Sequence, residues 1–141
     1  MGECVLLTKC DLPNEEITIS NNISNLVNNI NGNLNNLENP NTNLTTVLEE
    51  MNKNALKITY KINNFINSKL ISGYSSSEFS DLLYGVNNNA ENLSTIIAKT
   101  LNELSSNNIT DLATAYSFLK KATKKLFEYL MGQGYSVNVP V

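Results

Sequence analysis

The sequence of 141 residues contains no histidine, no arginine and no tryptophan, and it has only two cysteines. Without histidine, the Ser-His-Asp and Cys-His nucleophile systems lack their general base. The Glu-x-x-His pairs that hold di-metal sites in helical bundles are absent too, and two cysteines alone cannot complete a zinc site. Glycine-rich phosphate-binding loops and EF-hand patterns are also missing. We therefore predict no catalytic residue, no metal site and no cofactor, and we interpret the protein as non-enzymatic.

Charged residues are scarce as well. They make up 16% of the chain, against roughly 25% in ordinary globular domains, and ten lysines against thirteen acidic residues leave a net charge of −3. Binding to nucleic acid needs clustered cations that neutralise phosphates, so we do not expect nucleic acid as a partner. Asparagine, with 26 residues, takes the place of the missing charge. The composition thus predicts a polar surface with little charge on it.

Long hydrophobic runs are missing too. No apolar stretch approaches the roughly 20 residues that cross a bilayer. The first ten residues lack the basic start and the long apolar core of a secretory signal peptide, so none is expected. Cys4 and Cys10 either close a small loop or remain free thiols.

What the sequence does contain is helical periodicity. Apolar residues recur at spacings of three and four in four segments, and each set forms one stripe along a helix. The expected helices cover about 16–38, 43–71, 76–105 and 110–131. The residues expected to meet in one core are Leu26, Ile30, Leu48, Met51, Ile62, Leu93, Ile97, Leu119 and Leu126.

Short connections between these helices make neighbours antiparallel. We therefore predict an all-α fold, an antiparallel four-helix bundle that forms a single domain over residues 1–141. Gly85 and Asn87–Asn89 predict a kink or break in the third helix, and Asn108 or Thr110 is the expected cap of the fourth. The adjacent carboxylates Glu15–Glu16 lie near an expected helix start, where acids stabilise the dipole. The glycines expected to end the fourth helix are Gly132 and Gly134.

The two ends of the chain are predicted to form short extended arms. Val5–Leu7 is apolar, and Val137, Val139 and Val141 alternate, so that all three valines can point to one side. A strand this short is not stable alone. We expect the arms to pair with each other, within one molecule or between neighbours. Pairing between neighbours would make the C-terminal arm an assembly element by strand addition.

Several apolar side chains lie away from the core stripes. Leu56 and Tyr60 do so on the second helix and Tyr84 on the third, while the outward face of the first helix carries no charge between Glu16 and Glu38. Scattered apolar surface residues need no special explanation. The alternative is contact with other copies of the chain, where uncharged polar groups avoid repulsion and costly desolvation. The candidate assembly or partner contacts are Leu56, Tyr60, Tyr84, Val137, Val139 and Val141.

One cluster of charged residues stands out in the sequence, and it consists mainly of lysines. They lie opposite the core stripe of the fourth helix and in its last turns, where cations are favoured. A solvated face is the simplest interpretation. The more specific one is a docking patch for an acidic partner, or for an anionic membrane surface, which is less favoured. The lysines of this basic patch are Lys120, Lys121, Lys124 and Lys125.

These observations favour a non-enzymatic structural or assembly protein whose main partner is further copies of itself. At its most specific, this predicts a small helical coat, filament or accessory subunit of a virus or of an extracellular assembly, located there rather than in the cytoplasm. The alternative is a small helical regulator or inhibitor, of the immunity or antagonist type, that binds one protein partner. Such a regulator needs a single exposed groove or patch rather than several contact faces.

Overall fold

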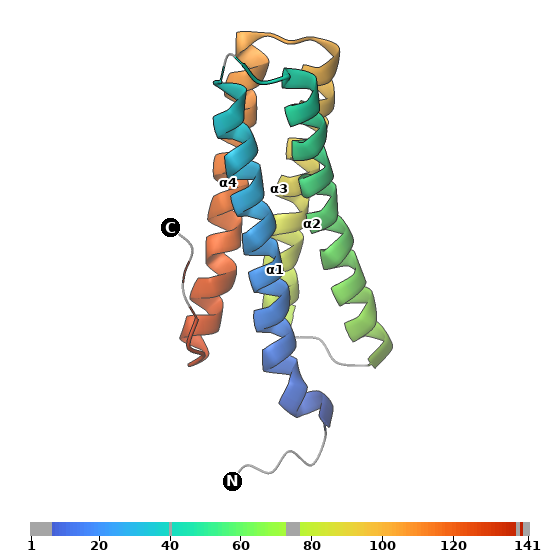
Figure 1. The fold of residues 1–141 in the computed structure, drawn as a ribbon. Helices are drawn as coiled ribbons and strands as arrows, with labels where there is room; N and C mark the ends of the chain where they lie inside the picture. Colours follow the sequence, from blue (N-terminus) through green and yellow to red (C-terminus); the bar gives the residue numbers. More distant parts are fainter. Residues whose placement is uncertain (1–6, 40, 73–76, 138, 140–141) are drawn as a thin grey trace.

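Four helices make up most of the protein in a computed structural model that describes residues 7–39, 41–72, 77–137 and 139, and the side chains of these except in 7–14 and 70–72. The helices are α1 (Leu7–Leu37), α2 (Leu44–Ser72), α3 (Ser77–Asn102) and α4 (Ser106–Gly132). Among the described residues there is no strand. The colours in Figure 1 show that the chain runs up, down, up and down through the bundle. The prediction of an all-α, antiparallel four-helix bundle is confirmed.

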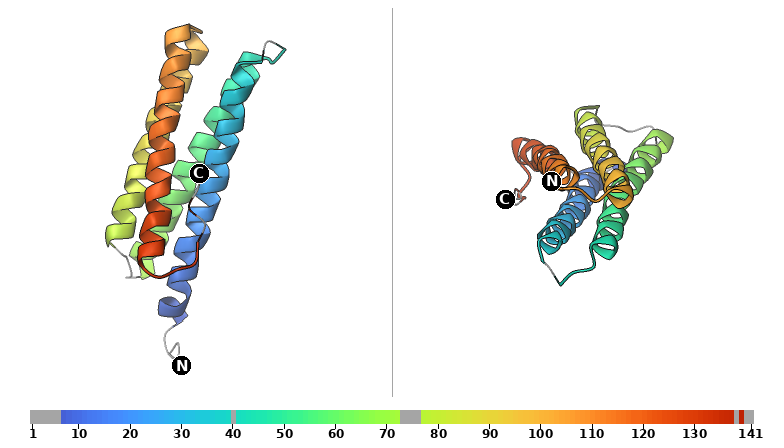
Figure 2. Two further views of the ribbon diagram at one scale, coloured as in Figure 1. Left: turned by 90° about the vertical axis from the view of Figure 1, so that its left-hand side faces the viewer. Right: turned by 90° about the horizontal axis from the view of Figure 1, so that it is seen from above.

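Each helix packs beside the next along the sequence, and α4 returns to α1, so that the four surround a common core (Figure 2, right). The contact between α1 and α4 is the least extensive of the four. Every residue predicted for the core is buried, with 8% of the side chain of Leu26 exposed and at most 1% of each of the others. The apolar stripes therefore predicted correctly which side of each helix is buried.

Aromatic rings join three helices near one end of the bundle. The ring of Phe79 in α3 lies 5.8 Å from that of Phe65 in α2, edge to face, and 5.8 Å from that of Tyr129 in α4. Phe79 is buried, and so is Phe127, which the predicted stripe of the fourth helix did not include. Rings at such distances contribute packing energy beyond their buried area.

The first helix begins earlier than its apolar stripe indicates. It starts at Leu7 instead of near residue 16, and Pro13 lies inside it. A proline inside a helix removes one ladder hydrogen bond and its ring crowds the carbonyl four residues earlier, which weakens the helix locally. The helix nevertheless continues through Pro13. The predicted extended arm is therefore wrong at Leu7, which cannot pair as a strand with the C-terminal arm. Val5 and Leu6 lie outside the described residues.

The corner between α3 and α4 also differs from its prediction. The cap of α4 is Ser105, in an extended conformation, whose side chain accepts a hydrogen bond from the backbone N–H of Asn108. Asn108 is buried, and its side-chain amide donates to the carbonyl of Glu103 at 2.7 Å. Neither Asn108 nor Thr110 is the cap, because α4 begins four residues before Thr110. Leu104, which falls within the predicted helix 76–105, lies beyond the end of α3 and is exposed.

No break divides α3 at its glycine and asparagines. The helix runs unbroken from Ser77 to Asn102, since the amides hydrogen-bond within it: Asn89 donates to the carbonyl of Gly85 at 2.8 Å, and Asn87 to the carboxylate of Glu91 at 2.9 Å. The predicted break is therefore absent.

The end of α4 is a Schellman turn. Gly134 has a φ of 93°, a left-handed conformation that glycine adopts at little cost. Its N–H donates to the carbonyl of Met131 at 2.9 Å, and the N–H of Tyr135 donates to that of Leu130 at 3.1 Å, the hydrogen-bond pair that defines this motif. The predicted stop is confirmed at Gly134, whereas Gly132 is the last helical residue.

The turn sends the C-terminal arm back along the side of the bundle where α4 faces α1 (Figure 2, left). Tyr135, Val137 and Val139 are half-buried and pack against the core. The arm is not a strand over its described residues, and Val141 lies outside them. Within one molecule, the arm thus covers the weakest of the four helix contacts.

Candidate interaction surfaces

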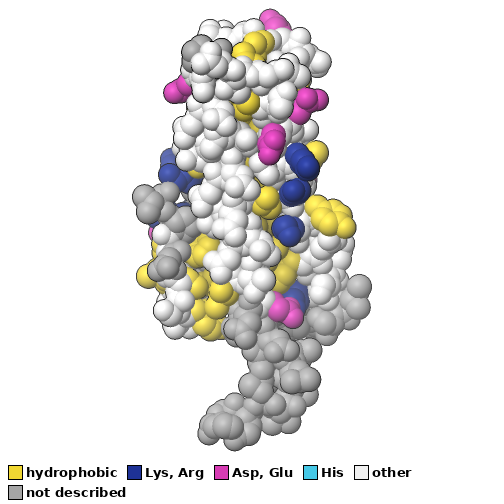
Figure 3. Space-filling view, in the orientation of Figure 1, with side chains coloured by type: hydrophobic (Ala, Val, Ile, Leu, Met, Phe, Trp, Pro, Cys, Tyr) yellow, Lys and Arg dark blue, Asp and Glu magenta, His cyan; other side chains and the backbone are white. Residues whose placement is uncertain are grey.

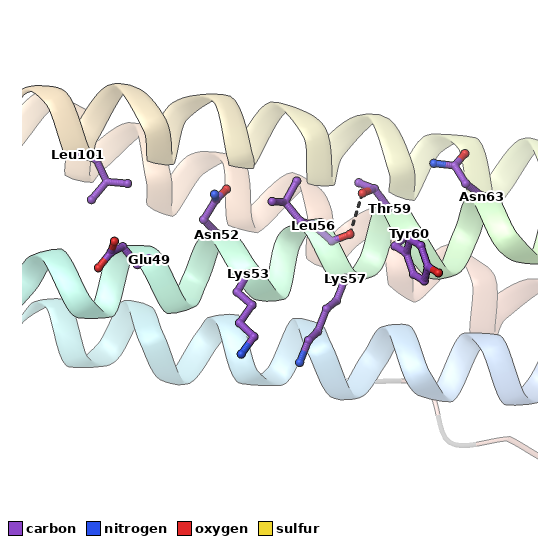
Figure 4. A pocket seen from close by; sticks show the side chains of 9 residues that line it. All are labelled: Glu49, Asn52, Lys53, Leu56, Lys57, Thr59, Tyr60, Asn63 and Leu101. Carbon is purple, nitrogen blue, oxygen red and sulfur yellow. Dashed lines mark hydrogen bonds between the residues drawn. The ribbon is translucent and has the colours of Figure 1, made fainter.

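The outer side of α2 exposes two large apolar side chains. Leu56 is 49% exposed and Tyr60 is 69% exposed, on the side of the helix opposite the buried Ile58 and Ile62. Figure 4 shows Leu56 directed to the α3 side of α2 and Tyr60 on its outer surface. Both were singled out from the sequence, and their exposure agrees with it. Their role in contacts with other molecules stays a prediction.

A row of lysines accompanies these side chains, and the sequence interpretation missed it. Lys53, Lys57 and Lys61 are all exposed and follow one another at four-residue intervals, which places them along one flank of α2. Lys53 and Lys57 point toward α1 in Figure 4, and Figure 3 shows a column of dark blue side chains beside yellow ones. The cluster on the fourth helix is therefore not the only one. The regular spacing was the signal that could have revealed this row.

Two hollows flank Tyr60. One, of about 790 Å³, runs along the outer side of α2, where Leu56, Tyr60 and Asn63 line it and Leu101 closes it from α3. The other, of about 570 Å³, lies between α1 and α2 over Ile19 and Leu26, with Tyr60 on its rim. Leu101 continues the apolar spacing of Leu93 and Ile97, but it lies in the last turn of α3 and is 37% exposed. We call the surface of Lys53, Leu56, Lys57, Tyr60 and Lys61 the α2 face.

The neighbouring helix α3 carries charges of the opposite sign. Asp81 and Glu91 are exposed, and Tyr84, between them in sequence, is 45% exposed. Spacings of three and seven residues place the three on one side of the helix. The hydrogen bond from Asn87 fixes the carboxylate of Glu91. We call Asp81, Tyr84 and Glu91 the acidic stripe.

The basic patch of α4 lies at the surface, as expected, but not in the last turn of the helix, because α4 ends at Gly132 and its last turn contains no lysine. All four of its lysines are exposed. Phe118, which the sequence interpretation did not single out, is 53% exposed nearby, and the Nζ of Lys121 lies 5.8 Å from the centre of its ring, within cation–π range. The patch therefore combines an aromatic side chain with four cations.

Asparagine serves two purposes in the bundle. On the outward face of α1, between Glu16 and Glu38, most of the asparagines are exposed, which gives this face amides without charge. Other amides join helices: Asn54 of α2 donates to Asn33 of α1 at 3.0 Å, and Ser94 of α3 donates to Asn52 of α2 at 2.5 Å. These bonds fix how neighbouring helices align along their lengths.

A buried polar cluster lies where the C-terminal arm meets α1 and α4. Glu16 is 5% exposed, and burial raises the pKa of its carboxyl from 4.5 to about 7. Ser20, one turn further along, is fully buried, and its hydroxyl makes no hydrogen bond to the described residues. Burial raises the pKa of Tyr135, and the nearby charges of Glu16 and Tyr129 raise it further.

The two adjacent glutamates do not stabilise a helix start as expected. Because α1 begins at Leu7, Glu15 and Glu16 lie in its third turn. Glu15 forms an ion pair with Lys69 of α2, and Glu16 faces the arm. Glu15 therefore contributes to the contact between α1 and α2, and Glu16 lies near the C-terminal arm.

In the described part of the chain, no group of three or more cysteine, aspartate, glutamate or histidine side chains comes together in a way that could hold a metal ion. None of its helices is long and apolar enough to cross a membrane. Cys4 and the side chain of Cys10 lie outside the described residues.

Comparison of the chain with models of protein families, with curated proteins and with solved structures finds no match. The surfaces described above are therefore the basis for any statement about function.

Proposed function

We propose that this protein is a non-enzymatic assembly subunit whose partners are further copies of the same chain. The observation that carries the proposal is the distribution of exposed apolar side chains. Leu56 and Tyr60 on α2, Tyr84 on α3 and Phe118 on α4 are each about half exposed or more, and they lie on at least two different faces. Single exposed apolar residues need no explanation, but apolar surface rimmed by polar groups marks contact sites. Leu56 and Tyr60 line one hollow beside lysines, and Phe118 lies beside Lys121. A subunit with several neighbours needs more than one such surface.

The polar part of the surface supports the same proposal. The outward face of α1 presents amides without charge. Removing a charged group from water costs far more than removing an amide that finds a hydrogen-bond partner. A face of amides can therefore be covered by another molecule at a smaller desolvation cost than a charged face.

The most specific form of the proposal is a coat, filament or accessory subunit of a virus or of an extracellular assembly. Contacts made through two different faces of one subunit generate rings when they close and helical filaments when they do not. A bundle with contact faces on α2 and α4 fits either arrangement.

A second candidate is a regulator or inhibitor of one partner protein. The observation that favours it is the exposed groove of about 790 Å³ along α2, through which such a protein could bind its partner. Phe118 and the lysines of α4, on a separate face, do not fit a single groove. We therefore place the assembly proposal first.

Sedimentation equilibrium over a wide range of concentrations tests the proposal. An assembly subunit has a mean mass that rises above the 15.6 kDa of one chain as concentration increases. A mass that stays at 15.6 kDa up to the highest attainable concentration contradicts self-assembly and favours the regulator. The measurement should be made at low and at physiological salt, because contacts between exposed charges are screened at high ionic strength.

A further inference from the structure

We infer that the α2 face and the acidic stripe form one self-complementary surface, which a second copy covers in a two-fold symmetric dimer. The inference rests on the proposed function and names the contact through which it starts. A two-fold interface uses the same patch on both subunits, so the patch must carry both halves of every interaction. This surface carries cations along α2, carboxylates on α3 and apolar side chains on both.

The acidic stripe lies close to the groove beside α2. Ser94 marks the side of α3 that faces α2, because its hydroxyl bonds Asn52. Counting about 100° per residue, Glu91 lies about 60° and Tyr84 about 80° around the helix from Ser94. Both therefore occupy the flank of α3 next to the groove, and Asp81 follows further out. Leu56 lies on the other side of the groove, where it projects from α2 toward α3 (Figure 4).

The heights of these residues along the bundle also match. Two contacts between the antiparallel helices fix the alignment: Asn52 is level with Ser94, and Phe65 is level with Phe79. Counting along both helices from these pairs places Glu91 between Lys53 and Lys57.

The same count continues toward the other end of the groove. It places Tyr84 level with Tyr60 and Lys61, and Asp81 about one turn beyond Lys61. Glu91 thus lies in height between two lysines of α2, and Asp81 lies beyond the third.

A two-fold axis parallel to the helices brings the residues of matching height in two copies into contact. Such an axis, lying over the groove, places α2 of the second copy opposite α3 of the first and leaves every height unchanged. Glu91 of each copy then faces Lys53 and Lys57 of the other, and Tyr84 faces Tyr60. The two Leu56 side chains meet on the axis, which gives the apolar centre and charged rim usual in interfaces.

The charges are available for such contacts. Among the described residues, the ion pair between Glu15 of α1 and Lys69 of α2 involves none of the side chains of this surface. Lys53 and Lys57 point toward α1 in Figure 4, away from α3 of their own molecule. Opposite charges that cannot meet within one molecule can meet between two.

Charge reversal provides the first test, measured as the dissociation constant of the dimer by sedimentation equilibrium. Lys53→Glu with Lys57→Glu should weaken the dimer at least about tenfold, because like charges would face each other. The matched control, Lys120→Glu with Lys124→Glu, changes the net charge equally on α4 and should leave the dimer intact. Equal weakening by both pairs of substitutions contradicts the inference. Circular dichroism confirms that each variant is folded.

The reverse substitutions complete this test. Asp81→Lys with Glu91→Lys should weaken the dimer to a similar extent, and an equimolar mixture of the α2 variant and this α3 variant should dimerise at concentrations at which each variant alone is monomeric. In the mixture each reversed surface meets its complement, which neither variant offers to itself. A mixture that remains monomeric overturns the pairing.

Cross-linking tests the position of the axis. With Cys4 and Cys10 replaced by serine, Leu56→Cys should form an intermolecular disulfide rapidly on mild oxidation, since the two-fold axis brings both copies of this position together. Phe118→Cys, at a site of similar exposure, 53% against 49%, is the control and should cross-link slowly. Equal rates overturn the inference.

The proposed function and this inference fail in different ways. A wild-type protein that is monomeric at every concentration contradicts both. A wild-type oligomer that charge reversal does not disturb, and in which Leu56→Cys does not cross-link, contradicts only this contact.

Discussion

At the scale of single residues, Glu16 is the most unusual group in the molecule. Its side chain is buried one helical turn before Ser20 and near Tyr135 of the C-terminal arm, and burial raises the pKa of its carboxyl to about 7. Burial of a carboxyl without a compensating cation favours its protonated form. The sequence shows only two adjacent glutamates, and which of them is buried depends on the path of the arm.

This carboxyl should make stability depend on pH. Its pKa is about 7 in the folded protein and 4.5 in the unfolded chain, so the folded state binds more protons between these values. Stability should therefore be greatest below pH 4.5 as far as this group is concerned, and fall by about 1 to 3 kcal/mol as the pH rises to 7 and above. Urea unfolding at pH 5 and pH 8 measures the fall. Glu16→Gln, which cannot ionise, should reduce it; an unchanged fall would show that another group is responsible.

Two adjacent residues of α4 test the phase of its stripe. Leu119 is fully buried, and Phe118 is 53% exposed. Leu119→Ala should lower the free energy of unfolding by about 2 to 5 kcal/mol, because it removes buried methyl groups and leaves a cavity. Phe118→Ala should cost much less, about 0.5 kcal/mol. Denaturant titrations of both variants check this, and similar losses would mean that the stripe is wrongly placed.

At the scale of helices, periodicity was enough to identify all four and their buried sides, because a stripe such as Leu48, Met51 and Ile62 is repeated over many turns. The ends could not be predicted equally well. Ser105, Asn108 and Thr110 are all residues that cap helices, and the choice among them depends on Asn108 being drawn inward to bond Glu103. Leu104 continued an apolar spacing beyond the point where the helix ends.

The cap of α4 can be tested directly. Ser105→Ala should destabilise the protein by about 1 kcal/mol, since the N–H of Asn108 would lose its hydrogen-bond acceptor. Thr110→Ala is the control, because the hydroxyl of Thr110 bonds the carbonyl of Ser106 within the helix and contributes little there. Thermal unfolding of the two variants distinguishes them. A larger loss for Thr110→Ala would restore the cap that the sequence favoured.

At the scale of the whole molecule, the candidate contact residues divide into two groups. The exposure of Leu56, Tyr60 and Tyr84 could be predicted because angular position on a helix follows from spacing. The match between the lysines of α2 and the acids of α3 could not, since it depends on the alignment set by Asn52 and Ser94. Long-range alignment of this kind is not visible in the periodicity of either helix.

Removal of residues 135–141 tests the C-terminal arm. Tyr135, Val137 and Val139 are half-buried against the core, so the truncated protein should lose about 1 to 3 kcal/mol of stability through lost apolar burial. Its association state should not change if the arm acts within one molecule. Chemical unfolding and sedimentation of the truncated chain measure the two properties. Unchanged stability together with lost association would instead make the arm the assembly element that its alternating valines predicted.

The narrow contact between α1 and α4 also indicates where the folded protein opens. This seam is formed between the two most distant helices in the chain and is the least extensive of the four, with the arm beginning at Gly134 lying over it. Segments with fewer packed neighbours undergo local opening at lower free energy than the rest of a protein. Amide hydrogens of α1 should accordingly exchange with deuterium sooner than those in the centre of α3. When the bundle opens locally, α1 should be the first helix to separate from the others.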